Sequence, residues 1–226
     1  AAVSMTAMLA ICTATTSVIH ASTLQEPGYT ETVIGSIAEA TNGFGGMTTD
    51  DGGNLYFAAN FANEIYKAPP GGPLAQFGTV AGSTANGIVI VGDTLYSSFT
   101  ASNQVFAQDL TQGAPNGTLV ANVSGPMGMA VAPSGFGAFG GQLIIGTVSN
   151  GIVALDVGSG VVTPVSNAAN LVSDVAFTPD GRLLALPANG QLLEISADGS
   201  STVFASGLGA ADGLDVHSTT GEIFVA

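Results

Sequence analysis

A repeat with a period of about forty residues runs through most of the chain. Five positions, each following Gly, Asn or Asp, open an apolar stretch: Met47, Ile88, Met129, Val175 and Leu214. They lie 41, 41, 46 and 39 residues apart. A period that survives four intervals predicts a repeat architecture, in which each unit is one supersecondary motif that buries its apolar surface against its neighbours.

Each unit contains four short strand-like segments separated by turn residues. The first turn carries pairs such as Gly92-Asp93 or Asp180-Gly181, which supply the positive φ that tight hairpins require. A strongly apolar second segment follows, for example Leu183-Leu184-Ala185. An Asn-containing turn, a third segment, a Gly-containing turn and a fourth segment complete the unit. Four strands per unit without helical periodicity predict a propeller blade.

We therefore predict an all-β fold, a β-propeller of four-stranded blades with six blades in the ring. The chain is expected to be incomplete and to carry about four and a half blades, because part of the ring lies outside this sequence. The propeller is expected over 23–226, with Tyr29 to Gly35 as an outer strand that completes the last blade. The predicted blades span 43–82, 83–124, 125–170 and 171–208, with a partial fifth blade over 209–226.

Residues 1–22 have the pattern of a signal peptide that is clipped at its N-terminus. The run Ala2 to Ile19 is largely apolar and almost uncharged, and small residues follow at Ala21 and Ser22. Cys12 is the only cysteine and lies inside this segment, so the mature chain would have no thiol. We expect a secreted, cell-surface or periplasmic protein whose mature domain does not insert into a membrane.

The charge balance excludes some partners. Lys67 and Arg182 are the only fixed cations against sixteen carboxylates, which gives a formal net charge of −14. Binding to nucleic acid or to anionic lipid requires several Lys or Arg side chains, and this chain lacks them. A small neutral molecule, a cation or a protein partner remains, and the complete ring is expected to be monomeric.

Several other polar or aromatic positions have ordinary structural interpretations. Asp50-Asp51 is expected in the first hairpin turn, and His217, the only histidine outside the signal peptide, beside a turn. One histidine cannot build a Ser–His–Asp arrangement or a His-rich metal site. The apolar loop Phe136 to Phe139 is expected either to pack under the neighbouring blade or to form an exposed contact surface.

Polar residues precede the inner strands, which begin around one mouth of the central channel. Asn86, Asp174 and Asp212 are at these starts, and Asn42 and Pro126 hold comparable positions in the first and third units. Carboxylate and amide oxygens facing a common axis suit a hard cation such as calcium. The alternative is that these residues only shape the turns that enter each strand.

Parts of the repeat resemble known propeller families. Met47 to Gly72, with Asn63-Glu64-Ile65-Tyr66, resembles an NHL-type repeat. Asn86-Gly87-Ile88 and Asp212-Gly213-Leu214 are similar to the gluconolactonase-like six-bladed propellers of the senescence marker protein type. The third unit, from Ala132 to Ile152, resembles exported propeller proteins of unknown role that carry a PEP-CTERM sorting tail.

The gluconolactonase-like resemblance implies a divalent metal that polarises a lactone carbonyl while a carboxylate assists water. Asn86, Asp174 and Asp212 would then be metal ligands, with Asp174 or Asp212 as the catalytic base. The chain departs from the family at residues 42–46, where Asn-Gly-Phe-Gly-Gly replaces the family's Glu-Gly-Pro.

Two functions follow, and whether the protein is an enzyme stays open at this point. The first is an exported propeller that binds a ligand or partner at the channel mouth, with calcium as the candidate ion. The alternative is a calcium-dependent lactonase or related ester hydrolase of the gluconolactonase-like type.

Overall fold

The structure is a computed structural model that describes residues 44–59, 63–113 and 115–226. The predicted signal peptide over 1–22, the predicted outer strand over 29–35 and Asn42 lie outside these residues. Within them, the chain folds almost entirely into antiparallel β-sheets. The one helical element in the described part is η1 (Gly137–Phe139), a single 3-10 turn. The predicted all-β class is confirmed.

Four sheets have four strands each, and each sheet is a continuous stretch of chain whose strands pair in sequence order. The first contains β1 (Phe44–Thr49), β2 (Leu55–Ala59), β3 (Glu64–Ala68) and β4 (Ala75–Thr79). The second contains β5 (Ala85–Val91), β6 (Thr94–Phe99), β7 (Gln104–Asp109) and β8 (Thr118–Asn122). The third contains β9 (Pro126–Val131), β10 (Leu143–Thr147), β11 (Ile152–Asp156) and β12 (Val161–Ser166). The fourth contains β13 (Val172–Phe177), β14 (Leu183–Pro187), β15 (Gln191–Ile195) and β16 (Ser201–Ser206).

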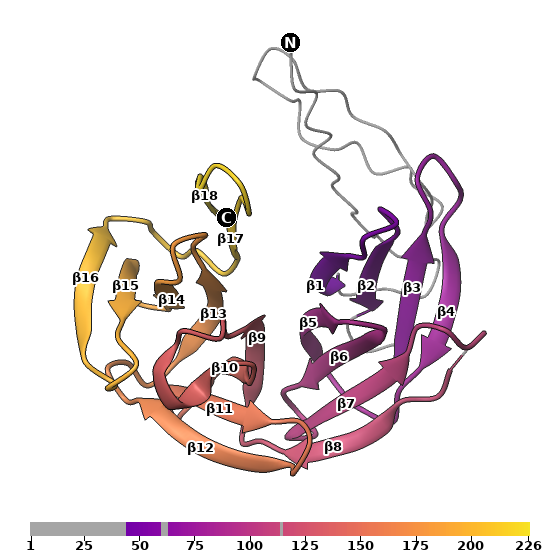
Figure 1. Cartoon of the computed structure of the whole chain (residues 1–226), viewed down its shortest axis with the longest axis horizontal. Helices are drawn as coiled ribbons and strands as arrows, with labels where there is room; N and C mark the ends of the chain where they lie inside the picture. The colour runs from indigo at the N-terminus through magenta and orange to yellow at the C-terminus, as the bar shows by residue number, and fades with distance from the viewer. Residues whose placement is uncertain (1–43, 60–62, 114) are drawn as a thin grey trace.

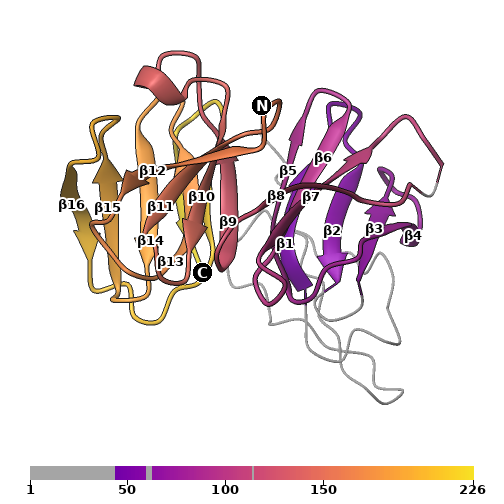
Figure 2. The same cartoon turned by 90° about the horizontal axis from the view of Figure 1, so that it is seen from below.

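A fifth sheet pairs β17 (Leu214–Val216) with β18 (Ile223–Val225). The five sheets, blades 1 to 5 in chain order, form an arc around one axis, with the first strand of each blade innermost (Figure 1). The fourth strands, β4, β8, β12 and β16, lie on the outside of the arc. Figure 2 shows the same blades from the side, with their strands running in roughly the same direction. This is the arrangement of a β-propeller, as predicted.

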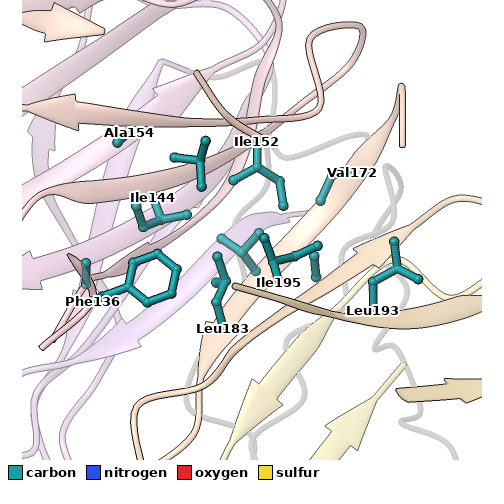
Figure 3. Close-up of a cluster of buried hydrophobic side chains, with 12 residues drawn as sticks. Phe136, Ile144, Ile152, Ala154, Val172, Leu183, Leu193 and Ile195 are labelled. Carbon is teal, nitrogen blue, oxygen red and sulfur yellow. The ribbon is translucent and has the colours of Figure 1, made fainter. Parts of the chain in front are cut away.

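The core lies between blades rather than inside one. The second strands of blades 3 and 4 are buried along their whole length, because neighbouring blades cover both of their faces. This explains why these segments are continuous apolar runs instead of alternating ones. The cluster between blades 3 and 4 joins Ile144 and Ile152 to Val172 and Leu183 (Figure 3). Each fully buried Leu or Ile side chain contributes about 1.5–3 kcal/mol.

The apolar loop of the third blade packs against its neighbour. Phe136 is 6% exposed, and its ring meets the ring of Phe177 in β13 edge to face, with centroids 5.0 Å apart. Phe139 packs beside it, with ring centroids 6.5 Å apart. Of the two interpretations of this loop, packing under the next blade is therefore the correct one.

Candidate functional site

The inner strand of each of blades 1 to 4 has a β-bulge near its start, and blade 5 has the hydrogen bonds of a bulge directly before β17. In β5, for example, Ala85 pairs with Phe99 and Ile88 pairs with Ser97, so Asn86 and Gly87 together face only Ser98. β1, β9 and β13 show the same one-residue shift. In blade 5 the N–H groups of Asp212 and Gly213 both donate to the carbonyl oxygen of Ala226. The bulge pairs are Gly45-Gly46, Asn86-Gly87, Met127-Gly128, Ser173-Asp174 and Asp212-Gly213.

The second residue of the bulge is glycine in four of the five blades. A Cβ atom on Gly87 would lie 2.4 Å from the carbonyl oxygen of Met127 in the next blade. A Cβ atom on Gly46 would lie 2.6 Å from the carbonyl oxygen of Asn86. Neighbouring inner strands therefore approach each other so closely that a side chain at this position does not fit without movement of the backbone.

Side-chain hydroxyl groups link the bulges of blades 2 and 3. The buried Ser98 hydroxyl accepts a hydrogen bond from the Gly87 N–H (2.7 Å) and donates one to the carbonyl oxygen of Met127 (2.6 Å). Thr100 donates to the carbonyl oxygen of Pro126 (2.6 Å). These bonds satisfy carbonyl groups that the irregular ladder leaves unpaired, and they fix the spacing between the two blades.

Asp174 occupies the bulge position that is glycine in the other four blades, and its carboxylate lies among three blades. A Cβ atom on Gly128 of blade 3 would lie 1.9 Å from its Oδ1 atom, so the carboxylate covers the Gly128 Cα. Its Oδ2 atom accepts a hydrogen bond from the Leu214 N–H of blade 5 (2.9 Å). Its Oδ1 atom accepts one from the N–H of Val175 in its own strand (2.9 Å). A single side chain thus connects the inner strand of blade 4 to those on either side.

The environment of Asp174 favours its protonated form. Burial raises the pKa of its carboxyl group to about 7, and the nearby negative charges of Asp215 and Asp212 add to the rise. The hydrogen bonds from Leu214 and Val175 lower the pKa and offset part of this effect. A carboxyl group with a pKa near neutrality exchanges its proton under physiological conditions, and such groups are common at functional sites.

Of the three residues predicted to converge, Asp174 and Asp212 lie close enough for their charges to interact. Asp212 is exposed on blade 5 and lies close enough to Asp174 to raise its pKa. Asn86 is on blade 2, and blade 3 separates it from blade 4 (Figure 1). The side-chain amide of Asn86 donates to the Thr100 hydroxyl and to the carbonyl oxygen of Thr84 (3.4 Å). Its assignment as a ligand remains a prediction.

Two features of this site were missed by sequence reasoning. Asp215, on β17, is a third carboxylate close to Asp174. The bulge was also missed, although the residues directly before the five repeat positions Met47, Ile88, Met129, Val175 and Leu214 indicate it. These preceding residues are Gly46, Gly87, Gly128, Asp174 and Gly213, and only Asp174 is not glycine.

Strain is stored beside the channel mouth at Thr84, which directly precedes β5. Its φ is 62°, a left-handed conformation that is unfavourable for a β-branched residue. The equivalent position before β9 is Gly125, with a φ of 55°. Such strain is often retained at functional sites.

We expect Thr84→Gly to raise the free energy of unfolding by about 1 kcal/mol, because glycine adopts this conformation without strain. Chemical denaturation measures the change. Ser83→Gly, at a neighbouring residue without a positive φ, is the matched control and should be neutral or slightly destabilising. A loss of stability in Thr84→Gly equal to that of the control would show that the position is not strained.

The other predicted polar positions have structural partners. Asp50 accepts hydrogen bonds from Asn54 and from the Tyr56 hydroxyl (3.1 Å) in the first hairpin turn. Desolvation raises the pKa of Asp50, but these hydrogen bonds outweigh it and the net pKa is lowered. His217 Nδ1 accepts the N–H groups of Thr219 (3.2 Å) and Thr220 (3.1 Å), so this ring caps a turn.

A divalent metal ion would find only part of its ligand set here. Among the described residues, no group of three or more His, Cys, Asp or Glu side chains is arranged to hold a metal ion. Asp174 and Asp212 nevertheless supply carboxylate oxygens from adjacent blades, the ligands that calcium prefers. Calcium also accepts water, amide and carbonyl oxygens, which would have to complete the coordination of an ion at this place.

Comparisons with solved structures identify the fold. Virginiamycin B lyase from Staphylococcus aureus superposes with a TM-score of 0.61 at 17% identity, over 81% of this chain and 69% of that chain. A nidogen/laminin complex chain gives a TM-score of 0.67 at 13% identity, over 80% and 71% of the two chains. Regucalcin from Agrobacterium tumefaciens, a calcium-binding protein, gives 0.60 at 19% identity, over 80% and 66%.

No protein-family model and no curated protein sequence matches the chain. The structural similarities, all below 20% identity in these three cases, confirm the β-propeller fold. One fold carries many functions, so the activity must be argued from the site itself. The resemblance to PEP-CTERM proteins remains a prediction. Among the described residues, no helix is both long and apolar enough to cross a bilayer.

Proposed function

We propose that this protein is an exported propeller that binds a ligand or partner at the mouth of its channel, around a calcium ion held by Asp174 and Asp212. The observation that carries the proposal is the carboxylate of Asp174 at a repeat position that is otherwise glycine. A carboxylate placed between inner strands is costly to bury, and it is retained where it has a function more readily than where it has none.

The electrostatics support a cation at this place. Asp174, Asp212 and Asp215 lie close enough for their charges to interact, and the chain as a whole carries a formal charge of −14. Bringing like charges together disfavours their ionised forms, and a bound divalent cation removes that penalty. Regucalcin, a propeller of similar fold, is a calcium-binding protein, which favours calcium among the hard cations.

The ion would provide a binding position for a second ligand at the channel mouth. With its charge largely neutralised by the carboxylates, calcium still accepts neutral oxygen ligands such as hydroxyl or carbonyl groups. A small neutral molecule or a loop of a protein partner supplies such groups. The scarcity of Lys and Arg argues against nucleic acid as the ligand.

The proposal predicts that calcium stabilises the protein through these two carboxylates. At a calcium concentration about 100-fold above Kd, binding to the folded state adds about 2.7 kcal/mol, a rise in Tm of roughly 5–10 °C relative to a chelator. The rise should disappear in Asp174→Asn and Asp212→Asn. Asp198→Asn, which removes an exposed carboxylate from a turn of blade 4, is the control and should keep it.

A rise in Tm that persists in both site variants would place any calcium elsewhere. No rise in the parent protein would remove the calcium-centred site.

The second candidate is a calcium-dependent lactonase, and it is favoured by the presence of two carboxylates from adjacent blades at the channel mouth. In this reaction one of Asp174 and Asp212 would hold the ion and the other would act as the general base. The carboxylate could take a proton from water while the ion polarises a lactone carbonyl. Hydrolysis of a set of sugar lactones and simple lactones tests this reaction. Turnover that depends on calcium and is lost in Asp174→Asn would favour the enzyme over the binding protein.

A further inference from the structure

A pocket lies between blades 1 and 2, at the end of the blades opposite the channel mouth. It has a volume of about 390 Å3. The hairpin turn between β1 and β2 lines one side, and the turn between β5 and β6 lines the other. Pockets of this size hold small-molecule ligands in many proteins. None of the residues assigned to the channel mouth takes part in it.

Lys67, the only lysine of the chain, lines this pocket. Its ammonium nitrogen lies 5.2 Å from the centre of the Tyr56 ring and 5.8 Å from that of Phe77. The ion pairs found in the described part of the chain both belong to Arg182, so Lys67 has no carboxylate within 4.0 Å there. In a chain with sixteen carboxylates, this ammonium group lies against two aromatic rings and forms a hydrogen bond with the Tyr56 hydroxyl, and an ammonium group has three donors, so donors remain for another molecule.

Acceptor groups face the same pocket. Asp93 and Asp51, both exposed, come from the two hairpin turns. Asp50 is fixed by hydrogen bonds from Asn54 and Tyr56, which hold its pKa below the ordinary value against the opposing effect of desolvation. Most of the remaining lining is polar, with hydroxyl groups such as that of Thr111, while Ile90 and Leu110 add a small apolar surface. A ligand therefore meets both strong acceptors and a strong donor.

The charges narrow the chemical class of the ligand. Three carboxylates against one ammonium group repel an anion, and the net charge of the chain repels it further. An apolar ligand would remove water from these charged groups without replacing their hydrogen bonds, which costs free energy. Hydroxyl groups donate to carboxylates and accept from ammonium groups. We propose that this pocket, between the first hairpin turns of blades 1 and 2, binds an uncharged polyhydroxy compound of monosaccharide or disaccharide size.

Saturation-transfer NMR of the whole protein with glucose, galactose, mannose, xylose, N-acetylglucosamine and cellobiose tests the proposal. At least one of these sugars should bind, and calorimetry then gives its affinity. Lys67→Met keeps most of the aliphatic stem and removes the ammonium group, and Asp93→Asn removes an exposed acceptor charge. Each should weaken binding about tenfold or more, the effect of losing one hydrogen bond to a charged group.

Two controls separate this pocket from the rest of the molecule. Arg182→Met removes the other cation of the chain, outside the pocket, and should leave sugar binding unchanged. Asp174→Asn should also leave it unchanged, which makes the test independent of the channel mouth. Thermal unfolding of each variant checks that the fold is intact, and Asp93, in an exposed turn, gives a readout even if Lys67→Met is unstable.

The proposal is overturned if none of the six sugars binds. It is also overturned if binding survives both pocket variants, or if Asp174→Asn abolishes binding while Lys67→Met leaves it intact, since the sugar would then be at the channel mouth.

Discussion

Replacing Gly87 by alanine is expected to lower the free energy of unfolding by about 3 kcal/mol, which corresponds to a fall in Tm of roughly 10 °C. The added Cβ atom would lie 2.4 Å from the carbonyl oxygen of Met127 and 3.0 Å from the Gly128 Cα and the Met129 nitrogen. All three atoms belong to the backbone of the next inner strand, so no side-chain rotation relieves the overlap. Blades 2 and 3 must separate, and buried contacts between them are lost.

Gly135→Ala is the matched control for this substitution. Gly135 is exposed, has no positive φ, and a Cβ atom there has no atom within 4 Å. Its replacement should change the free energy of unfolding by less than about 0.5 kcal/mol. Denaturant unfolding followed by circular dichroism measures both variants. Equal, small effects would show that the inner strands are not packed as closely as described.

The second large effect concerns Asp174 and pH. With calcium removed by a chelator, the protein should lose stability as the pH rises from about 4 to about 7, because the carboxyl group gives up its proton at a low pH when unfolded but near pH 7 when folded. The folded state binds more protons in this window, so the slope is negative, about 1.4 kcal/mol per pH unit, for a total on the order of 4 kcal/mol. Asp174→Asn should remove most of this slope.

The described carboxyl groups whose pKa is lowered act in a different pH range. Hydrogen bonds within turns lower the pKa of five other aspartates, and for Asp180 the main bond comes from Thr178. The stability that these five carboxylates add to the folded state is lost only as the pH falls below about 4. These groups are Asp50, Asp109, Asp156, Asp180 and Asp198. The difference between the parent protein and Asp174→Asn in urea unfolding at pH 5 and pH 8 therefore measures the contribution of Asp174. Parallel curves for the parent protein and Asp174→Asn would contradict the assignment, and Asp198→Asn should follow the parent in this window.

The repeat allowed the fold to be predicted, because its period and turn residues are local properties of the sequence. Strands such as Leu183–Pro187 are apolar along their length, and that follows directly from burial between two blades. The hairpin turns at Gly92 and Gly181 were likewise predicted, because tight hairpins require residues with positive φ, and both glycines have a positive φ in the structure. These features depend on neighbours in sequence.

The site was predicted only in part, because its geometry depends on the contact between blades. Asn86 and Asp212 are first residues of their bulges, whereas Asp174 is the second residue of its own, so the three are not equivalent. A one-residue difference within a bulge redirects a side chain, and composition does not reveal it. The pocket around Lys67 was missed for a similar reason, since its two sides come from turns about forty residues apart.

The central claim is that Asp174 and Asp212 hold one calcium ion at the channel mouth, and isothermal titration calorimetry with calcium at pH 8 tests it most directly. We predict one ion per chain in the parent protein, weaker binding at pH 5 where Asp174 is protonated, and no binding in Asp174→Asn. Asp198→Asn should bind as the parent does. A parent protein that takes up no calcium, or an Asp174→Asn variant that binds it with unchanged affinity, would contradict the claim.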